Sequence, residues 1–131
     1  MDEAQLLRET AERAIRYRQG LPTSPVTPSA PAARLRAALD GPTPEQPADA
    51  AEVVRRVADV LEAGGLMAMG SGRFFGFVIG GATPAALAAD WLVSAWDQNT
   101  GLFAPTPGTA VVEEVAGRWL LDILGLPPHC S

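Results

Sequence analysis

Apolar residues recur at helical spacing in several separate stretches of the chain. Over residues 2–19 the apolar positions share one helical face with Arg18, and they are Leu7, Ala11, Ala14 and Ile15. Residues three, four and seven positions apart lie on the same face of a helix, so this stretch is predicted to be an amphipathic helix. Gly20 and Pro22 end it, because neither residue type continues a helix well.

Two more helical stretches follow, separated by proline-rich links. A short helix is predicted over residues 31–39, after an extended link over residues 21–30. A longer helix begins at Asp49, whose carboxylate can cap it, with Glu52 at the capping-box position. An inward apolar stripe is expected along this helix, made of Val53, Val54, Val57, Val60 and Leu61.

Residues 70–81 have a different character, because glycines alternate there with aromatic and β-branched residues. We expect an extended, aromatic, partly buried segment. Glycine at this density indicates close backbone approach or unusual φ angles. Phe74, Phe75 and Phe77 could line a pocket for a planar ligand or pack in a core, and composition does not choose between the two.

Two helices are predicted in the last part of the chain, each opened by a Thr-Pro pair, which places threonine at the N-cap and proline at the first helical position. One runs from Thr83 to about Gln98 and the other from Thr106 to about Leu124. The first is apolar on nearly all sides and therefore needs burial. Its Asp90 and Asp97, seven residues apart, form either a buried polar pair or an exposed edge. Core packing is the expected role of the three tryptophans.

These elements predict a mostly α protein, with five helices around one extended segment and no βαβ alternation. The 131 residues include 47% hydrophobic ones and carry a net charge of −5, which gives no basis for nucleic-acid binding. No stretch is long and apolar enough to span a membrane. The acidic start lacks the features of a signal peptide, so a cytoplasmic location is expected. His129 and Cys130 alone do not make a metal site.

Lysine is absent, and all 10 basic residues are arginine. A Schiff base requires a primary amine, which a guanidinium does not supply. No histidine lies inside the chain to activate a serine or cysteine. The chain is therefore expected to contain no catalytic residue of its own.

Several motifs, taken in order, resemble the N-terminal part of the group II pyridoxal-phosphate-dependent amino-acid decarboxylases, which include the aromatic amino-acid, histidine and glutamate decarboxylases. The first is the run from Arg73 to Gly81, reading RFFGFVIGG. Val26 and Pro28, followed by a leucine-rich turn near Leu35, are similar to that family's arm. The others are Thr106-Pro107, Val112-Glu113-Glu114-Val115, Trp119-Leu120 and Leu124-Gly125-Leu126-Pro127.

The resemblance implies a type I transferase fold, which is α/β in the complete enzyme and works as a homodimer. Residues 1–66 would be the helical arm that wraps the partner subunit, and residues 67–131 would begin the large domain. The cofactor-binding sheet, the cofactor pyridoxal 5′-phosphate and the catalytic lysine, histidine and aspartate of this carboxy-lyase would lie beyond Ser131.

The resemblance also assigns a wall of the amino-acid substrate pocket to six residues: Phe77, Val78, Ile79, Gly101, Leu102 and Phe103. Aromatic decarboxylases have Tyr-Phe-Pro at the position of the first three, so this pocket is more apolar and its substrate is not named. Two alternatives remain: a stand-alone helical interaction or dimerisation module, and a small-molecule binding protein that uses the phenylalanine cluster.

Overall fold

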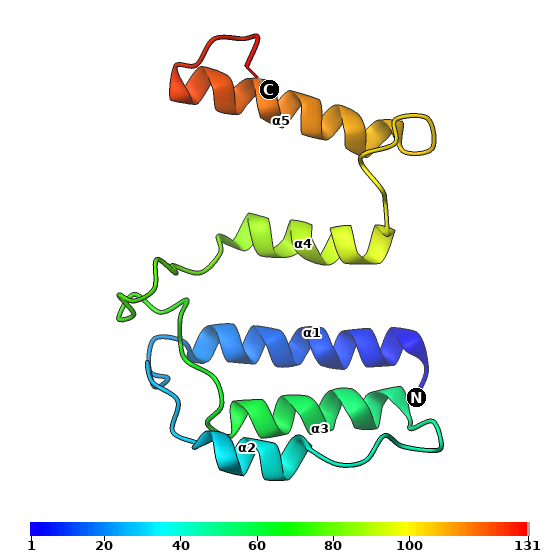
Figure 1. Cartoon of the computed structure of the whole chain (residues 1–131), viewed down its shortest axis with the longest axis vertical. Coiled ribbons are helices and arrows are strands. Elements are labelled where there is room, and N and C mark those ends of the chain that lie inside the picture. The colour runs from blue at the N-terminus through cyan, green and yellow to red at the C-terminus, as the bar shows by residue number, and fades with distance from the viewer. Residues whose placement is uncertain (131) are drawn as a thin grey trace. The chain divides into compact units, whose positions relative to one another are not determined.

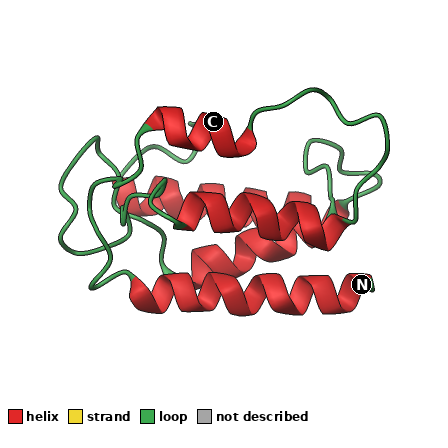
Figure 2. Cartoon of the chain, turned by 90° about the horizontal axis from the view of Figure 1, so that it is seen from below, coloured by secondary structure: helices red, strands yellow, loops and turns green. Residues whose placement is uncertain are grey.

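The computed structural model describes residues 1–130, and within that range it contains helices and loops but no strand (Figures 1 and 2). The mostly helical class is thereby confirmed. The chain divides into two compact units, Met1–Ala82 and a second unit that begins at Thr83. The helices are α1 (Glu3–Gly20), α2 (Ala32–Leu39), α3 (Ala50–Glu62), α4 (Pro84–Trp96) and α5 (Pro107–Leu124).

Two of the predicted helix starts have the N-cap hydrogen bonds that the sequence predicts. The Asp49 carboxylate accepts hydrogen bonds from the backbone N–H groups of Ala51 (3.0 Å) and Glu52 (3.2 Å) at the start of α3. The Thr83 hydroxyl accepts from the Ala86 N–H at 3.3 Å, with proline at the first position of α4. These side chains satisfy backbone donors that have no partner inside the helix.

The start of α5 differs from the prediction. Thr106 occupies the N-cap position but its side chain makes no capping bond to the helix. The hydroxyl instead lies against carbonyl oxygens of the preceding loop. The Thr-Pro pair therefore marks the helix start correctly, while the threonine side chain acts on the loop.

In the first unit, α3 lies beside both α1 and α2 (Figure 1). The link to α1 is polar: Nε and Nη2 of Arg13 donate to the two carboxylate oxygens of Glu62, at 2.8 and 2.9 Å. Nη2 also lies 2.7 Å from an Asp59 carboxylate oxygen. Hydrogen bonding to Glu62, and then to Asp59, raises the pKa of the Arg13 guanidinium above its ordinary value, so this charge persists at any ordinary pH.

The apolar core of the described chain is small. Its buried apolar residues are Leu21, Ala30, Ala51 and Ala68, and within residues 1–130 no large side chain is fully buried. The predicted inward stripe of α3 is only partly covered, because Val60 and Leu61 are half-buried while the three earlier valines are exposed. The stripe prediction is wrong for Val53, Val54 and Val57, since α1 and α2 cover a narrower face than the apolar pattern offers.

The second unit also departs from prediction. Helix α4 ends at Trp96, and Asp97 adopts a left-handed conformation with φ 49°, so Asp97 caps the helix instead of continuing it. Asp90 and Asp97 are both exposed, as are nearly all residues of α4, so their exposure does not distinguish an edge of the helix from a pair that is buried in a larger assembly. The expected core packing of the tryptophans is not found in residues 1–130, where Trp91, Trp96 and Trp119 are all exposed.

Helix α5 ends where it was predicted to end, with Gly125 in a left-handed conformation at φ 65°. Glycine adopts this conformation without the steric penalty of a Cβ, and it is the usual residue just after a helix. Along residues 1–130, no helix combines the length and the apolar composition that crossing a membrane requires.

Candidate functional site

The six predicted pocket residues lie in two short loops, one in each compact unit. Phe77, Val78 and Ile79 belong to the first unit, and Gly101, Leu102 and Phe103 belong to the second. Each loop is described by itself.

The first loop is a tight turn with an unusual backbone. The Ile79 N–H donates to the Gly76 carbonyl oxygen at 3.1 Å. The two central residues, Phe77 and Val78, have φ angles of 55° and 57°. This left-handed region suits glycine or asparagine, and a β-branched residue such as valine is a true outlier there. Such strain costs on the order of 1–3 kcal/mol per residue and is concentrated at functional sites.

This turn is exposed, which corrects the expectation of an extended, partly buried segment. Phe75 is 93% exposed, Phe77 80% and Val78 108%. The Phe77 ring stacks on that of half-buried Phe74, with centroids 6.5 Å apart and an interplanar angle of 30°. Within this chain the side chains of the turn therefore form an exposed apolar surface.

The second loop is held by Thr106, a buried residue. Its hydroxyl lies 2.6 Å from the Asn99 carbonyl oxygen and 2.7 Å from that of Leu102, and its N–H donates to the Leu102 carbonyl at 3.2 Å. The Asn99 side chain in turn accepts from the Gly101 N–H at 3.1 Å. Hydrogen bonds within the loop therefore hold its backbone. The side chains of Leu102 and Phe103 are exposed, with exposed fractions of 55% and 64%.

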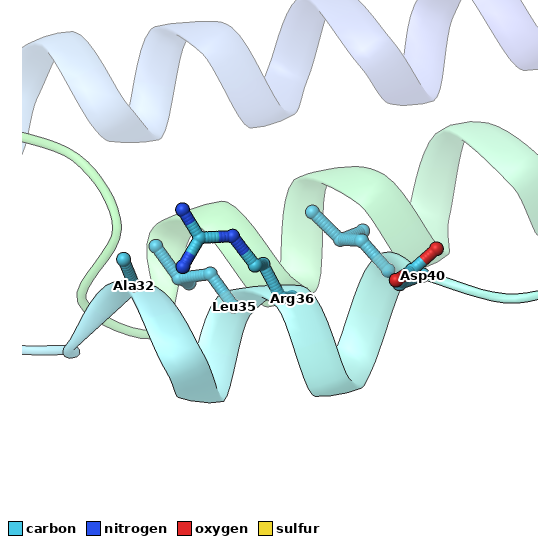
Figure 3. Close-up of a pocket in the computed structure, with 5 residues that line it drawn as sticks. Ala32, Leu35, Arg36 and Asp40 are labelled. Carbon is cyan, nitrogen blue, oxygen red and sulfur yellow. The ribbon is translucent and has the colours of Figure 1, made fainter.

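A hollow of about 390 Å³ lies on α2 and its C-cap residue (Figure 3). It is open, and α2 and its cap provide the whole lining: Ala32, Leu35, Arg36, Leu39 and Asp40. One guanidinium and one carboxylate on an apolar surface do not form an acid–base or nucleophile pair. The hollow could accommodate an apolar side chain, but its lining contains no pair of groups suited to catalysis.

A second hollow, of about 260 Å³, lies between α1 and α3 and includes Arg13 and Asp59. The carboxylates of Asp59 and Glu62 already neutralise Arg13. These charges therefore join two helices and are not available to a ligand.

A third hollow, of about 380 Å³, lies where the end of α1 meets the glycine-rich segment. Two arginines, Arg18 and Arg73, line it together with buried Ser71. None of the three was a candidate from the sequence. The available signal was the position of Arg18 on the apolar face of its helix, where a charged side chain needs a specific partner.

The residues of this chain do not fit pyridoxal phosphate as a covalently held group. The covalent link needs a primary amine, and the chain has no lysine. The amino group of Met1 forms an ion pair with an Asp49 carboxylate oxygen 3.8 Å away, at the start of α3. Within residues 1–130, no group of three or more histidine, cysteine or acidic side chains could hold a metal ion.

Comparison with protein-family models, with curated proteins and with solved structures finds no match to this chain. The resemblance to the group II decarboxylases rests on the motif residues themselves.

Proposed function

We propose that this chain is the N-terminal portion of a pyridoxal-phosphate-dependent amino-acid decarboxylase, and that it contributes pocket wall and dimer contacts to that enzyme. The observation that carries the proposal is the order of the motifs, from RFFGFVIGG at Arg73–Gly81 through Thr106-Pro107 to Gly125-Leu126-Pro127. No single motif is specific, but their shared order and separation are.

Two features of the structure support a role as pocket wall. The turn at Phe77 and Val78 holds a strained backbone and exposes apolar side chains, a combination typical of functional segments. Hydrogen bonds from Thr106 hold the backbone of the loop that carries Leu102 and Phe103. Both loops offer apolar surface suited to an amino-acid substrate.

The exposed helices support the proposed homodimer. On α4 and α5, Trp96 is 56% exposed, Trp119 68% and Ile123 77%. Large exposed apolar patches mark surfaces that another protein surface covers. In the complete enzyme, the rest of the large domain and the partner subunit would supply that cover. A cytoplasmic location is part of the same proposal.

Pyridoxal phosphate would serve as the electron sink of the complete enzyme, held by residues outside this chain. Because the residues of the chain do not fit the cofactor, no step of the reaction is assigned to them. Their proposed contribution is to exclude water from the substrate and to shape the pocket.

The experiment that tests the proposal is to sequence the coding DNA downstream of codon 131 and translate it in every frame. The proposal expects a glycine-rich segment followed by a histidine-lysine pair, which would supply the phosphate loop and the anchoring amine. A downstream region without either feature in any frame would exclude the decarboxylase.

The same exposed apolar helices also favour a second function, that of a stand-alone helical dimerisation module. A module of this kind forms a discrete dimer with one cooperative melt whose midpoint rises with protein concentration. A portion of a larger enzyme associates without a fixed stoichiometry instead, because its apolar surfaces do not match one another. Sedimentation velocity over a range of concentrations separates the two.

A further inference from the structure

The hollow between Arg18 and Arg73 has the composition of an anion site. It measures about 380 Å³, and its remaining lining is Leu21, Pro22, Gly70, Ser71 and Gly72. It lies wholly within the first unit. Its lining includes no acidic side chain.

Both guanidiniums are anchored by backbone carbonyls. Nη2 of Arg18 donates to the Ala82 carbonyl oxygen at 3.1 Å, and Nη2 of Arg73 donates to that of Ser24. A guanidinium has five N–H donors in a rigid fork, so each arginine keeps further donors. Nη1 of Arg18 lies against Gly70, where an added Cβ would be 3.1 Å from it. A side chain at position 70 would crowd the Arg18 guanidinium, and glycine avoids this contact.

Within the described residues, neither guanidinium has an acidic partner. Between Met1 and Cys130, no carboxylate oxygen lies within 4.0 Å of either guanidinium. Arg13 and Arg118, in contrast, each have a carboxylate partner within that distance. Two like charges that line one hollow repel each other, and an anion between them is attracted to both, which offsets that repulsion.

Buried Ser71 adds a third polar group. Its hydroxyl oxygen accepts a hydrogen bond from the Arg73 N–H at 3.2 Å, which fixes the start of the turn and leaves the hydroxyl proton free to donate. We propose that this hollow binds a small oxyanion, held by the forks of Arg18 and Arg73 and by the Ser71 hydroxyl. Phosphate and carboxylate groups share this chemistry, since both accept paired hydrogen bonds from guanidinium. The proposal does not depend on the decarboxylase function.

The test is a titration of the full 131-residue chain with sodium phosphate, and separately with sodium acetate, at an ionic strength held constant with sodium chloride. The Nε–H resonances of the arginines report binding. The proposal expects saturable shifts at Arg18 and Arg73 in at least one of the two titrations, with Arg34 unaffected on the exposed face of α2. The salt that saturates the shifts identifies the anion class.

Variants locate the site. Arg73→Gln and Arg18→Gln should each raise the dissociation constant of the anion about tenfold, the effect of losing one charge-assisted hydrogen bond. Arg34→Gln should leave the dissociation constant unchanged. The wild-type titration decides the matter even if a variant fails to fold. Shifts that do not saturate with either salt, or that are equal at Arg34, would overturn the proposal and leave the arginines as ties between loops.

Discussion

Gly81 lies against the backbone of Gly70, so close that a Cβ on Gly81 would be 2.9 Å from the Gly70 Cα. Its φ of 83° is also one that other residues rarely adopt. Gly70 and Gly81 stand at the two ends of the aromatic segment, and their backbones cross in contact there. Gly70 also lines the Arg18–Arg73 hollow. The crossing fixes the base of the segment that carries the turn at Phe77.

Gly81→Ala should therefore destabilise the first unit by more than about 1 kcal/mol, because the methyl group meets backbone and the φ angle becomes strained. Gly80→Ala is the matched control, since a Cβ at Gly80 would meet nothing within 4 Å. Urea unfolding followed by circular dichroism gives both values. Equal stability of the two variants would contradict the crossing.

Arg13→Met should lower the free energy of unfolding by about 1 kcal/mol, the upper range for a partly exposed ion-pair network. The loss reflects three short contacts to Glu62 and Asp59. Arg8→Met on the same helix is the control, because within residues 1–130 Arg8 makes no ion pair. The difference should shrink at high salt, and a difference independent of salt would contradict an electrostatic origin.

The raised pKa of Arg13 determines how its contribution to stability depends on pH. A group whose pKa is higher in the folded state stabilises the fold below its unfolded pKa, and the gain is lost only as pH rises through the folded value. For Arg13 both values lie above the ordinary pH range. Arginine deprotonation should therefore not alter stability between pH 7 and about 10, so the deficit of Arg13→Met in urea unfolding should stay constant there. A deficit that disappears across this range would contradict the assignment.

Val78→Asn should stabilise the first unit by about 1 kcal/mol, because asparagine tolerates the left-handed region that valine avoids. The side chain of Val78 is fully exposed, so no packing is lost. Ile79→Asn, one residue on and outside the left-handed region, is the control and should not stabilise. Thermal melts compare the two, and a destabilised Val78→Asn would show that the turn is not strained.

Thr106→Val should loosen the loop before α5, because it removes the one hydroxyl proton that the Asn99 and Leu102 carbonyl oxygens share, at a cost of about 1–3 kcal/mol. The matched control is Thr109→Val, which removes a hydroxyl bonded to the Thr106 carbonyl at 3.2 Å. Hydrogen exchange of the backbone amides should accelerate at Leu102 in the first variant and not in the second. Unchanged exchange would show that the loop does not depend on Thr106.

The sequence predicted the helices well because their signals are local. Asp49 and Thr83 cap the helices they precede, and Gly125 ends the last one. These features depend on residues within a few positions of one another. The predicted end of α4 was two residues too late because Asp97 adopts a left-handed φ. Aspartate adopts that conformation only occasionally, so its presence in the sequence is a weak predictor of a helix end.

Burial was predicted less well. Val53, Val57 and the tryptophans have the spacing of core residues yet are exposed. Periodicity shows which residues need cover but not whether the chain itself provides it. The Arg18–Arg73 hollow was missed for a related reason, because residues 55 positions apart in the sequence come together only through the fold.

The most direct test of the central claim measures release of labelled CO₂ from carboxyl-labelled amino acids in the presence of pyridoxal phosphate. Two samples are compared, the 131-residue chain alone and the polypeptide translated through the downstream coding DNA. The account predicts release by the longer polypeptide only, because the chain has no side-chain amine to anchor the cofactor. Release by the chain alone, or by neither sample, would contradict it.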